Sequence, residues 1–169
     1  MMKKVLAVTM MICLLIPALA GCFSDPVQDD LLNYINKEIP TVRTLENSVS
    51  QMYTDITNDE NTDDATAATK FESELLPASE ELINKAKAIV PATEEVKKVH
   101  DKYIAALTAQ HDAFKLYKDA YANSDVDAVS KANDQMTKAL STSDEFLTEL
   151  RALEEKHNVE EVADSSTAK

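Results

Sequence analysis

Glycine is almost absent from this chain: the single glycine among 169 residues is Gly21. Tight hairpin turns rely on glycine because it adopts positive φ angles without a steric penalty. Phosphate-cradling loops and the dinucleotide-binding fingerprint need glycine for close backbone approach. The sequence after residue 21 therefore excludes these motifs and disfavours a sheet built from hairpins. It is rich in strong helix formers such as Ala, Leu, Glu and Lys, which predicts an all-α protein.

The first 21 residues have the three parts of a secretory signal peptide. Two lysines open the segment, an apolar run follows, and small residues precede Cys22. The uninterrupted apolar run is shorter than the roughly 20 residues that a membrane-spanning helix needs. Pro17 also disfavours a continuous helix through that point. The pattern predicts that residues 1–21 form a leader that is removed on export.

The four residues Leu19-Ala20-Gly21-Cys22 resemble a bacterial lipobox, the motif recognised by lipoprotein signal peptidase. The resemblance implies cleavage after Gly21 and a diacylglyceryl thioether on Cys22, with palmitate-like acyl chains. Two acyl chains hold a protein durably at a membrane, whereas one does not. The expected location is the extracytoplasmic face of the cell membrane. The alternative is ordinary secretion with Cys22 left as a free thiol.

Charge and cysteine content exclude further classes of function. Removal of the leader leaves 15 basic and 30 acidic residues, a net charge of −15. Nucleic acid would repel such a surface, so we expect no nucleic-acid partner. Cys13 leaves with the leader and Cys22 carries lipid. No thiol then remains for a disulfide, a cysteine nucleophile or a thiolate metal site.

The mature chain divides into three expected parts: a lipidated tether at 22–29, a helical domain at 30–157 and a flexible tail at 158–169. Apolar residues recur every three or four positions through the helical domain, which predicts four helices at about 29–57, 65–89, 94–122 and 125–157. The expected core positions of the first are Leu32, Ile35, Ile39, Val42, Leu45, Val49, Met52 and Ile56. Those of the fourth are Val129, Ala132, Met136, Leu140, Ser143, Leu147, Leu150 and Leu153, with Phe146 alongside.

Long amphipathic helices joined by short turns are typical of an up-down-up-down four-helix bundle. Pro40 and Pro77 lie inside the first two helices and predict kinks, or alternatively a division into shorter pieces. In antiparallel helices the two prolines would lie at one height, near Gln110 and Ser143. Such a kinked layer could leave a polar cavity. The aromatic residues of the third helix, Tyr103, Phe114, Tyr117 and Tyr121, are expected in the core.

The histidines do not form a metal site by spacing. His100 and His111 are eleven residues apart on one helix, about 16 Å along its axis. Glu154-x-x-His157 has the spacing of half a di-iron site, but a second such motif is absent. We therefore expect no metal, no cofactor and no catalytic residues, with His157 exposed at a helix end.

Two stretches, Asp25 to Asn36 and Val90 to Asp101, resemble small helical lipoproteins of unknown function from Bacillus-like Firmicutes. That resemblance implies no activity. The sequence predicts a non-enzymatic interaction or accessory module with an envelope protein as partner, contacted around Leu31, Leu76, Ile83 and Ile104. The alternative is a binding protein for a small ligand or metal ion, seated in the kinked layer or near His157.

Overall fold

The computed structural model describes residues 25–59 and 61–159, and these are helical apart from short connections. No strand occurs in these two ranges, which confirms the all-α prediction at that level. No helix among them is long and apolar enough to cross a membrane. The predicted leader, the cleavage site at Gly21 and Cys22, and most of the predicted tail lie outside the described residues.

The first helical stretch consists of α1 (Pro26–Asn33), the π-helical segment η1 (Tyr34–Glu38) and α2 (Pro40–Asn58). Asp25 caps it, because its Oδ1 accepts hydrogen bonds from the backbone N–H groups of Val27 and Gln28 at 2.9 and 3.3 Å. The helix thus begins inside the segment predicted as a tether.

The second stretch consists of α3 (Asp64–Lys70), the π-helical segment η2 (Phe71–Leu75) and α4 (Leu76–Lys87). The last two helices are α5 (Glu94–Ala122) and α6 (Val126–Lys156), within a residue of the predicted bounds. Asp63 and Asp125 cap α3 and α6 through their side chains. In the turn between α5 and α6, Ser124 has a positive φ of 48°.

Neither internal proline breaks its helix. A proline inside a helix has no N–H to donate, and its ring clashes with the carbonyl four residues back. The residue before Pro40, Ile39, donates to the carbonyl of Tyr34, five residues back, at 2.9 Å. Leu76 likewise donates to Phe71 just before Pro77. The wider π-turns make room for the prolines while the backbone stays right-handed helical, with Ile39 at φ −57° and ψ −40°.

Each π-turn adds one residue and so changes which residues face the core. Tyr34 and Val42 are eight residues apart and both buried, whereas two turns of an ordinary helix need only about seven residues. The side chain at Leu32, predicted in the core, is 39% exposed, and Leu31 is fully buried in its place. Leu31 and Ile83 are buried, so the predicted partner surface is wrong for these two residues.

The predicted core stripe of α6 is also partly wrong. Leu140 and Leu147 are 58% and 42% exposed, while Ala139 and Phe146 are buried. The helix carries two apolar stripes about 100° apart, and periodicity alone does not choose between them. The stripe that contains Ala139 and Phe146 faces α5, where the Phe146 ring contacts that of Tyr103 with centroids 5.1 Å apart.

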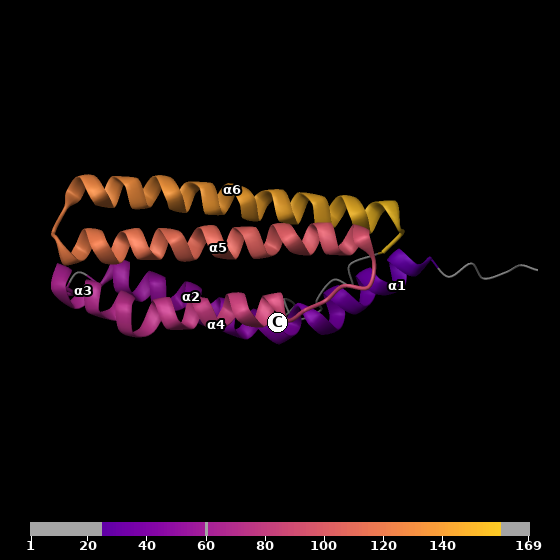
Figure 1. The fold of residues 1–169 in the computed structure, drawn as a ribbon, viewed down its shortest axis with the longest axis horizontal. Coiled ribbons are helices and arrows are strands. Elements are labelled where there is room, and N and C mark those ends of the chain that lie inside the picture. The colour runs from indigo at the N-terminus through magenta and orange to yellow at the C-terminus, as the bar shows by residue number, and fades with distance from the viewer. Residues whose placement is uncertain (1–24, 60, 160–169) are drawn as a thin grey trace, which may run out of the picture.

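The longest helices, α5 and α6, lie side by side along their whole length, and the remaining helices lie along the opposite side of α5 (Figure 1). The core between α5 and the first two helical stretches contains an aromatic cluster. Phe71 stacks on Tyr117 with ring centroids 5.8 Å apart, and the ring centroids of Tyr53 and Phe114 are 5.4 Å apart. Tyr103, Phe114 and Tyr117 are buried, which confirms the core prediction for these three residues, while Tyr121 is half-buried.

Two leucines of α6 provide a matched test of this packing. Leu153→Ala should destabilise the protein by about 2–5 kcal/mol, because Leu153 is buried. Leu147→Ala should cost less than about 1 kcal/mol, since much of that side chain is already in water. Urea unfolding of both variants measures the difference. Equal losses would contradict the observed orientation of α6.

Candidate functional site

Buried polar side chains gather where α1, the end of α4 and the start of α5 meet. Asp30 is the first of them. Its Oδ1 accepts a hydrogen bond from the backbone N–H of Ala92 at 3.0 Å. Its Oδ2 accepts from the backbone N–H and the hydroxyl of Thr93 at 2.8 and 2.7 Å. Because these three donors belong to the loop before α5, Asp30 fastens that loop to α1.

His100 joins three elements in the same region. Its Nε2 is 3.0 Å from the carbonyl oxygen of Ala86, which only accepts, so Nε2 carries the hydrogen. Its Nδ1 therefore accepts from the hydroxyl of Tyr34, at 3.0 Å. Burial lowers the pKa of His100, which favours this neutral form. Burial also raises the pKa of Tyr34 well above its ordinary value, so the hydroxyl keeps its proton.

A surface hollow lies beside this network, between the end of η1 and the end of α4. It is lined by Lys37, Glu38, Thr41, Lys85, Ala88, Ile89 and Val90. One carboxylate oxygen of Glu38, Oε1, accepts from Asn33 at 2.9 Å. The other, Oε2, is buried and has no hydrogen-bond partner. A buried carboxylate oxygen without a donor is costly, so this atom marks a place where a cationic group would be stabilised.

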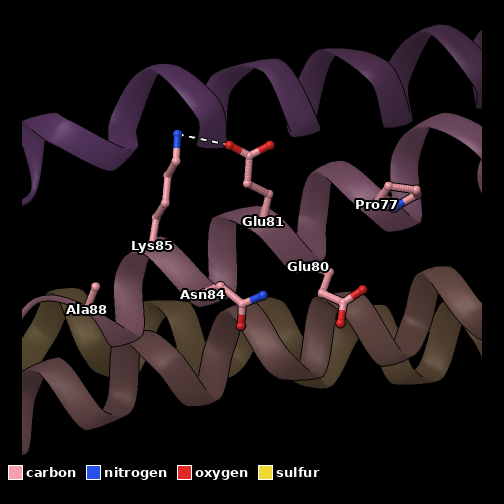
Figure 2. Close-up of a pocket in the computed structure, with 6 residues that line it drawn as sticks. All are labelled: Pro77, Glu80, Glu81, Asn84, Lys85 and Ala88. Carbon is pink, nitrogen blue, oxygen red and sulfur yellow. Dashed lines mark ion pairs between the residues drawn. The ribbon is translucent and has the colours of Figure 1, made fainter.

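A second hollow runs along the outer face of α4 and is shown in Figure 2. Glu81 and Lys85 point to one side of the helix and form an ion pair at 2.9 Å, while Glu80 and Asn84 point to the other. Its lining comes from α4 and the residue after it. Both members of the ion pair are more than half exposed, so this groove has the character of a solvated helix face.

The predicted kinked layer is not assembled as expected. Thr41, next to Pro40, lines a hollow with Lys85 and Ala88, so Pro40 lies beside the end of α4. Pro77 is eight residues before Lys85, about 12 Å further along that helix. The two prolines therefore lie at different heights. Of the two π-turns, only η2 lies between the connecting loop and its proline, so its added residue contributes to this offset.

The polar residues assigned to that layer make separate contacts. Ser143 donates its hydroxyl to the carbonyl of Ala139 on its own helix at 3.1 Å, and Gln110 is half-buried. Near Pro77, the hydroxyl of Ser79 is 2.6 Å from Nδ1 of His111. Burial lowers the pKa of His111. At the level of Pro77, the structure thus has a Ser79–His111 contact in place of the predicted polar layer.

His157 is buried, contrary to the prediction that it is exposed. Its Nδ1 is 2.5 Å from Asp25 Oδ2, and its Nε2 is 3.3 Å from Glu95 Oε2. Lys156 pairs with the same Glu95 carboxylate. The hydrogen bond to Asp25 is the main cause that raises the pKa of His157. Hydrogen bonds from His157 and Lys156 lower the pKa values of Asp25 and Glu95.

Residues 25–59 and 61–159 contain no group of three or more His, Cys, Asp or Glu side chains placed to hold a metal ion. The two nitrogens of His157 face different carboxylates, so an ion bound at one nitrogen would not meet both acids. Glu154, the other half of the Glu-x-x-His pattern, is buried and has a partner. Sequence reasoning missed Asp30, Tyr34 and Glu38, whose roles depend on contacts between segments far apart in the chain.

No protein family matches this chain, and comparison with characterised proteins and with solved structures found no similar one.

The His100 network makes a prediction about acid stability. His100→Leu leaves Tyr34 and Ala86 without their partner and should cost about 2–4 kcal/mol at pH 8. Because the folded pKa of His100 is lowered, its contribution is full above the ordinary value of 6.5 and is lost as pH falls below it. The stability gap between wild type and variant in urea unfolding should shrink from pH 8 to pH 5. A gap that widens on acidification would contradict a neutral His100.

Proposed function

We propose that this protein is a membrane-anchored extracytoplasmic lipoprotein whose helical body is a non-enzymatic interaction or accessory module. The observation that carries the proposal is the sequence Leu19-Ala20-Gly21-Cys22 directly after an apolar leader. The position of the first helix supports it, because Asp25 caps α1 three residues after Cys22. Three residues span at most about 11 Å, so the body would lie close to the lipid.

The contacts of the buried polar residues support a non-enzymatic role. Asp30, His100 and His157 each bind groups from other parts of the chain, and these contacts account for their burial. Buried polar side chains whose hydrogen bonds join separate helices make the core rigid, which is a structural role. None of the three lines the hollow at the end of α4.

We also propose that the helices form an up-down-up-down four-helix bundle in which each π-turn belongs to one continuous helix. Two contacts and one short connection support this arrangement. Thr41 lies beside Lys85, so the start of α2 lies near the end of α4. His100 binds Ala86, which brings the start of α5 to that same end. The short connection between α5 and α6 makes them antiparallel neighbours.

The outer face of α6 is the surface that we assign to an envelope protein partner. Leu140 and Leu147 are seven residues apart and lie on one side of the helix, with half of their side-chain area in water. We assign the partner surface to these two leucines in place of Leu31 and Ile83, which are buried in the core. Apolar residues at this spacing are typical of helix-to-helix recognition.

A second candidate function, binding of a small ligand, is favoured by the unpaired Oε2 of Glu38 beside the hollow that adjoins Pro40. The end of α4 at the same place carries the negative end of a helix dipole. Ile89 and Val90 supply apolar surface, and Val90 is largely exposed. Lys37 and Lys85 also line this hollow, so a small organic ammonium compound with an apolar body would need to place its cationic group at Glu38.

The lipid anchor is tested with the two cysteines of the chain. Cys22→Ser should abolish incorporation of labelled palmitate in a bacterial host and release the protein from the membrane fraction. Cys13→Ser is the matched control and should leave both unchanged, since residue 13 belongs to the predicted leader. Labelling that survives Cys22→Ser, or depends on Cys13, would overturn the proposal.

The ligand site is tested by thermal unfolding with a panel of small primary amines and free amino acids. A ligand present at 100 times its Kd adds about 2.7 kcal/mol of stability and should raise the Tm by several degrees. Glu38→Gln should abolish that rise, whereas Glu80→Gln on the outer face of α4 should retain it. If no compound stabilises wild type, or if Glu38→Gln responds equally, the second candidate is wrong.

A further inference from the structure

Three segments far apart in the chain meet at the ring of His157. Asp25 precedes α1, Glu95 lies in the first turn of α5, and His157 directly follows α6. The ring itself is buried, whereas the side chains of both acids are 40% exposed. The arrangement brings the beginning of the described chain against the end of its last helix.

The geometry specifies the charge on His157. An ionised carboxylate only accepts hydrogen bonds, so a ring with one carboxylate at each nitrogen needs a hydrogen on both nitrogens. Only the imidazolium cation has two. A neutral ring has one N–H and one lone pair, and that lone pair would face a carboxylate oxygen. On loss of the proton, one of the two contacts must therefore open.

We propose that His157 is a pH-sensitive clasp that holds the start of α1 against the ends of α5 and α6. The clasp is closed when the ring is a cation and loosens when the ring becomes neutral. It goes beyond the proposed function and does not require it, because its parts are all described residues. Where Cys22 is lipidated, the clasp would control how firmly the body is held to its own anchor.

Other groups around the ring limit how far the clasp opens. Lys156 pairs with Glu95 and keeps that acid in place when the ring is neutral. Lys98 and Glu149 lie nearby, because they line one surface hollow together with Glu95 and Lys156. Glu154 is buried one turn before His157. Gln28 also donates from α1 to the carbonyl of His157 at 2.8 Å, whatever the ring's charge. We therefore expect α1 to loosen and not to detach.

The pH range follows from the directions of the pKa shifts. The raised pKa of His157 means that its contribution is full below the ordinary value of 6.5 and is lost as pH rises through the raised folded value. The lowered pKa of Asp25 means that its contribution is full above 3.8 and is lost in stronger acid. The clasp is therefore strongest in mildly acidic solution and weakens in the alkaline direction.

Asp25→Asn is a precise variant for the test. Asparagine caps a helix as well as aspartate does, so the start of α1 keeps its hydrogen bonds to Val27 and Gln28. The substitution removes the charge that faces His157 and puts an amide donor in place of the accepting Oδ2, which suits a neutral ring with a lone pair on Nδ1. His157→Gln removes the titrating group itself. Comparison of the two separates the clasp from the helix cap.

The experiment uses the full chain as the expressing cell processes it, purified in mild detergent. NMR titration gives the pKa of His157, and hydrogen exchange, corrected for its intrinsic pH dependence, gives the opening of α1 relative to α5. We expect wild-type opening to increase between pH 5.5 and pH 8.5. The increase should be about tenfold for each unit by which the pKa of His157 exceeds its value in Asp25→Asn.

Both variants should lose this increase, with α1 opening to the same extent at the two pH values. Three results would overturn the proposal: a His157 that titrates at or below 6.5, an opening of α1 that does not change with pH in wild type, or the same change in Asp25→Asn and His157→Gln as in wild type. None of these results depends on whether Cys22 carries lipid.

Discussion

A proline inside a helix removes one hydrogen bond, and the way this chain absorbs that loss determines much of its interior. A π-turn stands directly before Pro40 and another directly before Pro77. The first adds a residue that rotates α1 relative to α2 and brings Tyr34 onto the same face as Val42. Tyr34 then reaches His100, and Glu38 reaches the hollow at the end of α4. The core contacts and the candidate ligand site thus share one backbone cause.

Much of the helical architecture is predictable from local signals. The period of apolar residues predicts α5 and α6 within a residue, and Asp63 and Asp125 cap helices where acidic residues precede apolar runs. The rotation at Tyr34 was not predictable, because a proline inside a helical pattern is compatible with a kink, a break or a π-turn. The choice between Leu140 and Ala139 in α6 depends on which face meets α5, and this is a property of the assembled helices.

The candidate sites were the least predictable part, because their residues meet across the fold. Asp25 and His157 are 132 residues apart, and Asp30 lies 63 residues before Thr93. Neither pair has a recognisable motif. All of these contacts fasten α1 to the start of α5 or the end of α6. Under the proposed lipid anchor, a pull from the membrane would reach α1 first, so a firmly held α1 would transmit that force to the whole body.

The most direct test of this account is the hydrogen bond that defines the first π-turn. NMR detects scalar couplings across hydrogen bonds, from an amide nitrogen to the carbonyl carbon that accepts its proton. We predict a coupling from the nitrogen of Ile39 to the carbonyl of Tyr34, five residues back. A coupling from Ile39 to Ile35, four residues back, would contradict the account. An ordinary helix at this point would place Ile35 in line with Val42, and Tyr34 would lose its position beside His100.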